Sequence, residues 1–233
     1  MSLFRISHAT VRALHRMIAR FWWGDTENKN KLHWSKWEDL CRYKVDGGLG
    51  FRDLTLFNKA LLAKQAWRII TKPDSLAARV LRGIYFPNIS FLQVQSSSSA
   101  SFIWHSILWG REIIEQMSRW SIGGGQDISI YNDRWIPRPS TFKVCSVHSL
   151  PEQAVVSSLK LPSGSWNKEF IAANFLPHEA DLILGLPSLD VCSPNILSWS
   201  YDRFGQYTVK SGYWFASNSL ERASSSDGFS FTS

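Results

Sequence analysis

The chain has few cysteines and no long uninterrupted apolar segment. Its 233 residues include 3 cysteines, far apart and odd in number, which argues against a secreted disulfide framework and favours a reducing compartment. The longest segment without a charged residue, 83–110, is interrupted by proline, asparagine, glutamine and four consecutive serines, so a membrane span is excluded. With 44% hydrophobic and 14% aromatic residues, we expect a packed core.

Acidic residues are absent from the first 24 positions, where arginines alternate with apolar side chains. This pattern is typical of a mitochondrial transit peptide. The alternative is a basic helix of a folded domain, favoured because Phe21, Trp22 and Trp23 at its end would be costly to leave unpacked. A location in the nucleus or cytoplasm is favoured, with the mitochondrion as the alternative.

The positive charge is concentrated in the N-terminal third. Residues 1–85 contain 16 Lys+Arg and 7 Asp+Glu, a net charge of +9, whereas residues 86–233 contain 10 and 12, a net charge of −2. Clustered cations neutralise phosphates and release counterions, so this third indicates a nucleic-acid partner. A solvated basic face is the alternative interpretation.

Residues for catalysis or metal binding are not assembled in any recognisable motif. Cys145 and His148 make a single pair without further ligands. The glycines at 47–50 and 123–125 lack the spacing of phosphate-binding loops and predict turns. Glu38-Asp39 has no hairpin context for holding two metal ions, and no nucleophile elbow occurs. We expect no catalytic residue, no metal and no cofactor.

The first predicted helix begins after Ser7 and ends at Gly24. On the face of this helix opposite its apolar side chains, Arg12, Arg16 and Arg20 recur every four residues, about 6 Å apart. Lys29, Lys31 and Lys36 in the following loop extend this basic row, and Trp22, Trp23 or Trp34 could stack on bases if exposed. Most of the 12 tryptophans are expected in the core. One face of the helix is predicted to pack through Val11, Leu14, Ile18, Phe21 and Trp22.

The remaining patterns predict an α+β protein that is mainly α-helical. Helices are expected over 54–70, 75–85, 102–117, 168–174 and 178–184, with a helix start at 211–215. Two small β-hairpins are predicted, over 120–135 and 197–210. The expected organisation is a basic helical segment at 1–94, a Ser-rich connection at 95–101, a mixed segment at 102–216 and a disordered tail at 217–233.

Several short motifs along the chain resemble sequence motifs of a single protein family. They include Phe21-Trp22-Trp23-Gly24, His33-Trp34, Gly47-Gly48-Leu49-Gly50-Phe51-Arg52-Asp53-Leu54, Phe57-Asn58-Lys59-Ala60-Leu61-Leu62-Ala63-Lys64-Gln65-Ala66-Trp67-Arg68, Asp133-Arg134-Trp135-Ile136-Pro137 and Tyr207-Thr208-Val209-Lys210-Ser211-Gly212-Tyr213. With these motifs the chain resembles plant LINE-type (non-LTR) retrotransposon polyproteins. The resembling segment lies between the reverse-transcriptase palm and the zinc-binding reverse-transcriptase domain.

The resemblance implies a helical, thumb-like N-terminal part that grips a template-primer of RNA or DNA. It makes Arg12, Arg16, Arg20, Lys64 and Arg68 the best candidates for phosphate contacts. The family is an RNA-directed DNA polymerase, but its palm motif Tyr-x-Asp-Asp, its zinc-binding cluster and its ribonuclease H carboxylates do not occur in this sequence. The chain on its own is therefore expected to be catalytically inactive.

Three hypotheses follow from this resemblance. The first is an inactive retrotransposon-derived fragment that retains nonspecific nucleic-acid binding. The second is the thumb-side part of a polymerase that acts with a separately encoded palm. The third is a non-functional relic. The sequence alone leaves these alternatives, the choice of RNA or DNA and the oligomeric state open.

Overall fold

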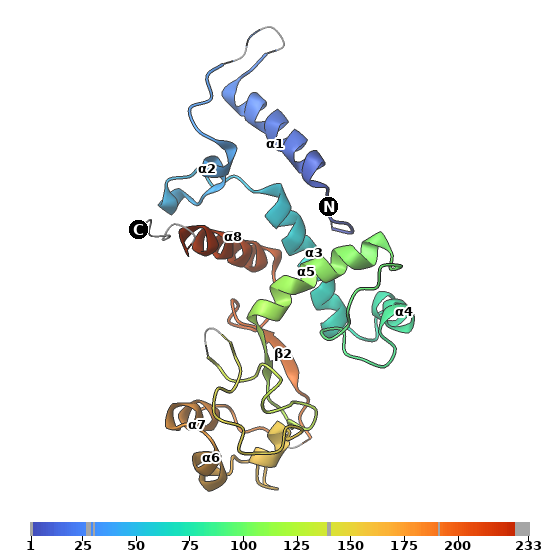
Figure 1. The fold of residues 1–233 in the computed structure, drawn as a ribbon, viewed down its shortest axis with the longest axis vertical. Helices are drawn as coiled ribbons and strands as arrows, with labels where there is room; N and C mark the ends of the chain where they lie inside the picture. Colours follow the sequence, from blue (N-terminus) through green and yellow to red (C-terminus); the bar gives the residue numbers. More distant parts are fainter. Residues whose placement is uncertain (1, 27–28, 30, 139–140, 191, 227–233) are drawn as a thin grey trace, which may run out of the picture. The chain divides into compact units, whose positions relative to one another are not determined.

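The structure is a computed structural model that describes residues 2–26, 29, 31–138, 141–190 and 192–226. Within this part, eight α-helices and one two-stranded antiparallel sheet are present (Figure 1). The prediction of a mainly α-helical α+β fold is therefore confirmed. The helices are α1 (His8–Trp23), α2 (Trp37–Cys41), α3 (Leu54–Thr71), α4 (Leu76–Tyr85), α5 (Phe102–Met117), α6 (Lys168–Asn174), α7 (Pro177–Leu184) and α8 (Val209–Ser226).

The chain divides into two compact units. Unit 1 consists of residues 1–116 and 208–233, and unit 2 consists of residues 117–207. This division differs from the expected connection at 95–101, because α5 and α8 both belong to unit 1. Residues 217–226 form the end of α8, where a disordered tail was expected, and residues 227–233 lie outside the described part. None of the helices described is long and apolar enough to cross a membrane.

Short polar side chains begin the helices of unit 1 where the sequence pattern places them. Ser7, Asp53 and Ser75 each accept a hydrogen bond from a backbone N–H in the first turn of α1, α3 and α4. Gly24 ends α1 in the left-handed conformation, with φ 73°, which costs glycine little because it has no Cβ. The helices predicted to begin after Ser7, at Leu54 and near Ser75 are thus confirmed.

Helix α3 is the centre of unit 1. It packs against α1, α4 and α8, and its side chains Leu62 and Trp67 are buried together with three alanines, Ala60, Ala63 and Ala66. These small residues let other helices approach closely. At the contact with α5, a Cβ on Gly110 would lie 2.4 Å from the backbone nitrogen of Ala63, so the crossing of α3 and α5 requires glycine.

Only part of the predicted apolar face of α1 is buried. Val11 is buried and Leu14 is half-buried, but Ile18, Phe21 and Trp22 are exposed, with Phe21 at 85%. The prediction of a fully packed face is therefore wrong for the second half of the helix.

The described residues of unit 2 contain one sheet, and the prediction of two hairpins is wrong. Strand β1 (Ser118–Ser121) pairs antiparallel with β2 (Ile196–Trp199). The first strand of one predicted hairpin thus pairs with the first strand of the other predicted hairpin. The expected second arms, around 128–130 and 206–209, do not form strands. In the first of these segments, Ile128 and Ile130 instead pack into a core around Trp135 and Trp166.

Both glycine clusters form turns, as predicted. In unit 2 the backbone N–H groups of Gly123 and Gly125 both donate to Oδ1 of Asn195 at 3.0 Å. In unit 1 the N–H groups of Gly48 and Gly50 donate to backbone carbonyls of Tyr43 and Arg42. The amides that a phosphate would need are therefore engaged within the protein.

Candidate nucleic-acid interface

The basic helix α1 is anchored to unit 1 by buried polar side chains. Asn58 on α3, which is 1% exposed, accepts from the Ile6 N–H at 2.9 Å and donates to the Phe4 carbonyl at 3.0 Å. Ser106 on α5 accepts from the Arg5 N–H at 2.9 Å. These bonds satisfy backbone groups just before α1 and fix where the helix begins.

His15 provides a second anchor in the middle of α1. Its Nε2 accepts from the backbone N–H of Leu54 at 3.2 Å, at the first residue of α3. Its ring lies against Trp37 with centroids 5.7 Å apart, and Trp37 stacks on Phe51 at 5.2 Å. The helix is therefore fixed along its length relative to α2 and α3, and so is its row of arginines.

Arg12, Arg16 and Arg20 form one exposed row on α1. Within the described residues, neither Arg12 nor Arg16 has an acidic partner, whereas Nε of Arg20 lies 3.7 Å from Oδ2 of Asp25. Two of the three guanidinium groups therefore make no ion pair within the described part of the chain. Both groups are therefore available for a charge-assisted hydrogen bond to an anion.

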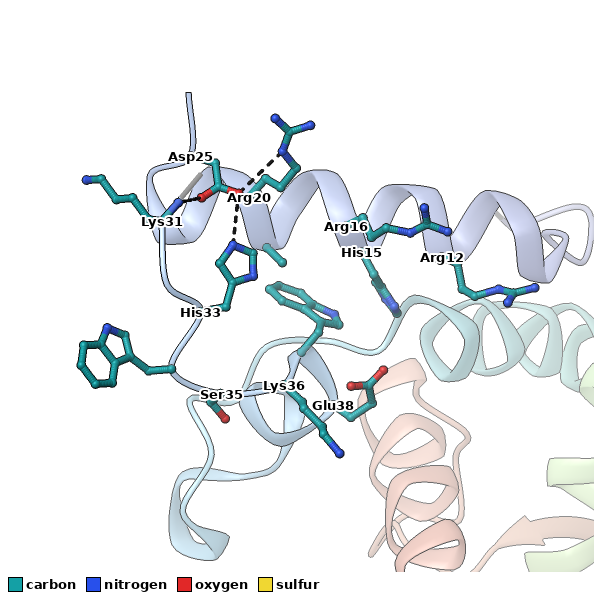
Figure 2. Close-up of a pocket in the computed structure, with 13 residues that line it drawn as sticks. Arg12, His15, Arg16, Arg20, Asp25, Lys31, His33, Ser35, Lys36 and Glu38 are labelled. Carbon is teal, nitrogen blue, oxygen red and sulfur yellow. Dashed lines mark hydrogen bonds and ion pairs between the residues drawn. The ribbon is translucent and has the colours of Figure 1, made fainter. Parts of the chain in front are cut away.

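An open cleft of about 850 Å³ lies along this row. Its second wall is the segment that returns after α1 (Figure 2), which contributes two of the lysines named from the sequence, Lys31 and Lys36. The lining residues are Arg12, His15, Arg16, Ala19, Arg20, Asp25, Lys31, His33, Trp34, Ser35, Lys36, Trp37 and Glu38. The lining thus includes five cationic side chains and two carboxylates, and Figure 2 shows the end of Arg20 turned away from the returning segment.

Asp25 holds the returning segment against the end of α1. Its Oδ1 accepts from the backbone N–H of Lys31 at 2.8 Å and its Oδ2 contacts Nε2 of His33 at 3.1 Å, as the dashed lines in Figure 2 show. The hydrogen bond from Lys31 lowers the pKa of Asp25, and His33 and Arg20 act in the same direction against the opposing effect of burial. The charged form of Asp25 thus closes the loop that carries Lys31 and Trp34.

The other two candidate phosphate contacts, Lys64 and Arg68, lie one turn apart on α3 and do not line this cleft. Partial burial lowers the pKa of Lys64, and the positive charges of Arg68 and Lys72 lower it further. Arg68 is exposed, with Nη1 3.5 Å from Oε1 of Gln65. The structure therefore assembles Arg12, Arg16 and Arg20 into one site with Lys31 and Lys36, and leaves Lys64 and Arg68 on a separate basic stripe.

The aromatic candidates differ in what they contact. The edge of Trp22 meets Phe51, with centroids 4.8 Å apart, and Trp23 stacks on His33 at 5.8 Å. Trp34 is 79% exposed. Of the 12 tryptophans, five are buried, four are half-buried and three are exposed, so most contribute to packing and Trp34 is the one most open to solvent.

Sequence reasoning missed the residues that build the cleft. His15 and Asp25 lie in none of the motifs, and the motif that includes Asn58 gives no sign of its contacts, which reach up to 54 positions along the chain. A weak signal existed for Asp25, because it is the first acidic residue after a run of 24 without any. In the described part of the chain, no three His, Cys, Asp or Glu side chains come together as a metal site.

Two proteins of Arabidopsis thaliana are similar to this chain. The "Uncharacterized mitochondrial protein AtMg00310" is 44% identical over 137 residues, which are 58% of this chain and 89% of that protein. The "Putative ribonuclease H protein At1g65750" is 28% identical over 224 residues. These are 91% of this chain and 35% of that protein, so the chain spans about a third of this longer relative. No family model and no solved structure matches the chain.

Proposed function

The chain belongs to the family of the uncharacterized mitochondrial protein AtMg00310 of Arabidopsis thaliana, and from this premise we propose that it is a retrotransposon-derived segment. In this proposal it binds nucleic acid without sequence preference and has no catalytic activity of its own. Two observations support the origin. The sequence resembles the post-palm segment of LINE-type polyproteins, and nearly all of the chain aligns with one third of a longer protein whose name includes ribonuclease H.

The observation that carries the binding proposal is the row of Arg12, Arg16 and Arg20 along an open cleft. Lys31 and Lys36 line the same cleft, so cations from two segments of the chain are available to a bound backbone. Contacts of this kind position a nucleic acid through its phosphates and carry no sequence information. Nonspecific binding is the function that this arrangement supports best.

Neutralising the row is expected to weaken binding strongly. The variant R12Q/R16Q/R20Q removes up to three phosphate contacts, which lowers affinity for a primer-template roughly 10- to 100-fold near physiological salt. The slope of log affinity against log salt becomes shallower by roughly 2 to 3, because fewer counterions are released. Fluorescence anisotropy with a labelled primer-template at several salt concentrations measures both quantities.

A matched control is available in unit 2. The variant K143Q/K168Q/R203Q removes the same number of positive charges from exposed positions and is expected to change affinity less than threefold. Equal losses in the two variants would mean that net charge alone governs binding. A titration of R12Q/R16Q/R20Q that coincides with that of the unsubstituted chain would contradict the proposed interface.

A second candidate function is the thumb-side part of an RNA-directed DNA polymerase that acts with a separately encoded palm. It is favoured by the alignment of 91% of the chain inside a longer relative, where the segment has further sequence on the same polypeptide. In this case a polymerase assay with the chain alone gives no product, and addition of a LINE-type palm gives primer extension. Extension that is the same with and without the chain would remove this candidate.

A further inference from the structure

We propose that the cleft between α1 and the returning segment takes a single-stranded nucleic acid, with one unpaired base stacked on Trp34. This inference rests on the proposed function, since it names the form of the nucleic acid that the same cleft prefers. It joins the two kinds of side chain found there, cations for the backbone and one open indole for a base.

Trp34 has the properties of a stacking platform. It lines the cleft, and 79% of its surface is accessible. Unlike Trp22, Trp23 and Trp37, whose rings contact Phe51 or His33, Trp34 makes no ring contact with any described residue. Exposure of a large apolar ring to water is unfavourable, and a base that covers one of its faces removes that cost.

The position of Trp34 is fixed by its flanking residues. On one side, the backbone of Lys31 and the ring of His33 are bonded to Asp25. On the other side, Trp37 begins α2 and stacks on Phe51. The backbone at Trp34 is thus held between two anchors, so little ordering of this segment is needed when a base binds.

The cleft that Trp34 lines has cationic residues on both of its walls. Arg16 and Arg20 belong to α1, and Lys31 and Lys36 flank Trp34 in the chain. A flexible single strand can place successive phosphates against both walls while turning one base towards the indole. This combination of a charged groove and an aromatic platform is the general pattern for binding of single strands.

A duplex does not satisfy the same arrangement. Its bases are paired and stacked on one another, so an indole reaches a base face only after the base has been unstacked and unpaired, which costs a few kcal/mol. A duplex therefore keeps the phosphate contacts with Arg12, Arg16 and Arg20 but gains nothing from Trp34. The preference for single strands should reside in this one side chain.

The test is a thermodynamic cycle in the full chain. Affinities are measured for an oligothymidylate of about twelve nucleotides, for the same strand with abasic sites in its centre and for a duplex of equal length, with and without Trp34→Ala. The substitution is expected to weaken binding of the intact strand about 10-fold and to leave the abasic strand and the duplex within twofold. Oligouridylate in a parallel titration separates RNA from DNA.

Two further variants make the result decisive. Trp34→Phe keeps an aromatic face and is expected to restore most of the affinity, whereas R12Q/R16Q/R20Q weakens all three ligands. The stacking inference is overturned, and the proposed function stands, if Trp34→Ala lowers the affinity for all three ligands equally. The same holds if Trp34→Ala changes no affinity while R12Q/R16Q/R20Q still weakens binding. If the unsubstituted chain binds none of the ligands, both are overturned.

Discussion

Gly110→Ala is expected to destabilise unit 1 by about 3 kcal/mol, the upper part of the range for overpacked cores. The added Cβ would lie 2.4 Å from the Ala63 nitrogen and from the Leu62 carbonyl carbon of α3. Both atoms belong to the backbone of a buried helix, so they cannot move aside as a side-chain end would. The two helices must separate and lose part of the packing around Leu62 and Trp67. Urea unfolding of the full chain measures the effect.

Gly83→Ala is the matched control for this prediction. Gly83 also lies inside a helix, α4, but a Cβ there meets no atom within 4 Å. Alanine is expected to stabilise the protein by about 0.5–1 kcal/mol, because glycine loses more backbone entropy in a helix. Hydrogen exchange of peptides from α3 locates the change. If both substitutions have the same sign, the contact between α3 and α5 does not have the close geometry described.

Glu179→Gln is expected to destabilise unit 2 by about 3 kcal/mol, as when one partner of a buried ionic network is lost. Glu179 is fully buried. One carboxylate oxygen accepts from the Cys145 N–H at 2.7 Å and from Nη1 of Arg138 at 3.2 Å. The other accepts from the N–H and the hydroxyl of Ser146. An amide turns one of these acceptors into a donor and leaves N–H groups facing it unsatisfied.

The effect of Glu179 is expected to depend on pH. Burial raises the pKa of its carboxyl, but hydrogen bonds from Ser146 and Cys145 and the proximity of His178 outweigh burial, so the pKa of Glu179 lies below its ordinary value. The charged form therefore stabilises the folded state fully above the unfolded pKa, and this contribution is lost as pH falls through the lower folded value. The difference between the original chain and Glu179→Gln should be largest near pH 7 and shrink below about pH 4.

Glu152→Gln serves as the control for this experiment. Glu152 is exposed in the same unit, so the same chemical change is expected to alter stability by less than about 0.5 kcal/mol. Hydrogen exchange of peptides from residues 117–207 between pH 3.5 and pH 7 reports on unit 2 by itself. A loss in Glu179→Gln that is equally large at both ends of this range would contradict an ionised Glu179.

The binding and stability predictions concern different parts of the molecule. Arg12, Arg16, Arg20 and Trp34 are exposed, so their substitution should change affinity without unfolding the chain. Gly110 and Glu179 are buried and lie outside the cleft. Variants at the two kinds of position therefore separate a loss of binding from a loss of fold.

The sequence alone determined most of the helices and the placement of positive charge. Helix α1 begins at a serine cap and ends at a glycine because these signals act within one turn. The boundaries of α5 and α6 also agree with the predicted ranges, since helical periodicity and capping are local properties. The arginine row followed from the same periodicity, because residues four apart share one face.

The tertiary structure alone decided the sheet, the cleft and the burial of individual residues. Strands β1 and β2 pair across about 80 positions, and no local pattern distinguishes this pairing from two hairpins. Phe21 is exposed although its spacing matches a buried face. The cleft exists because Asp25, His15 and Asn58 fold distant segments onto α1. Such contacts depend on which segments meet in space, and that is determined by the packing of the whole chain.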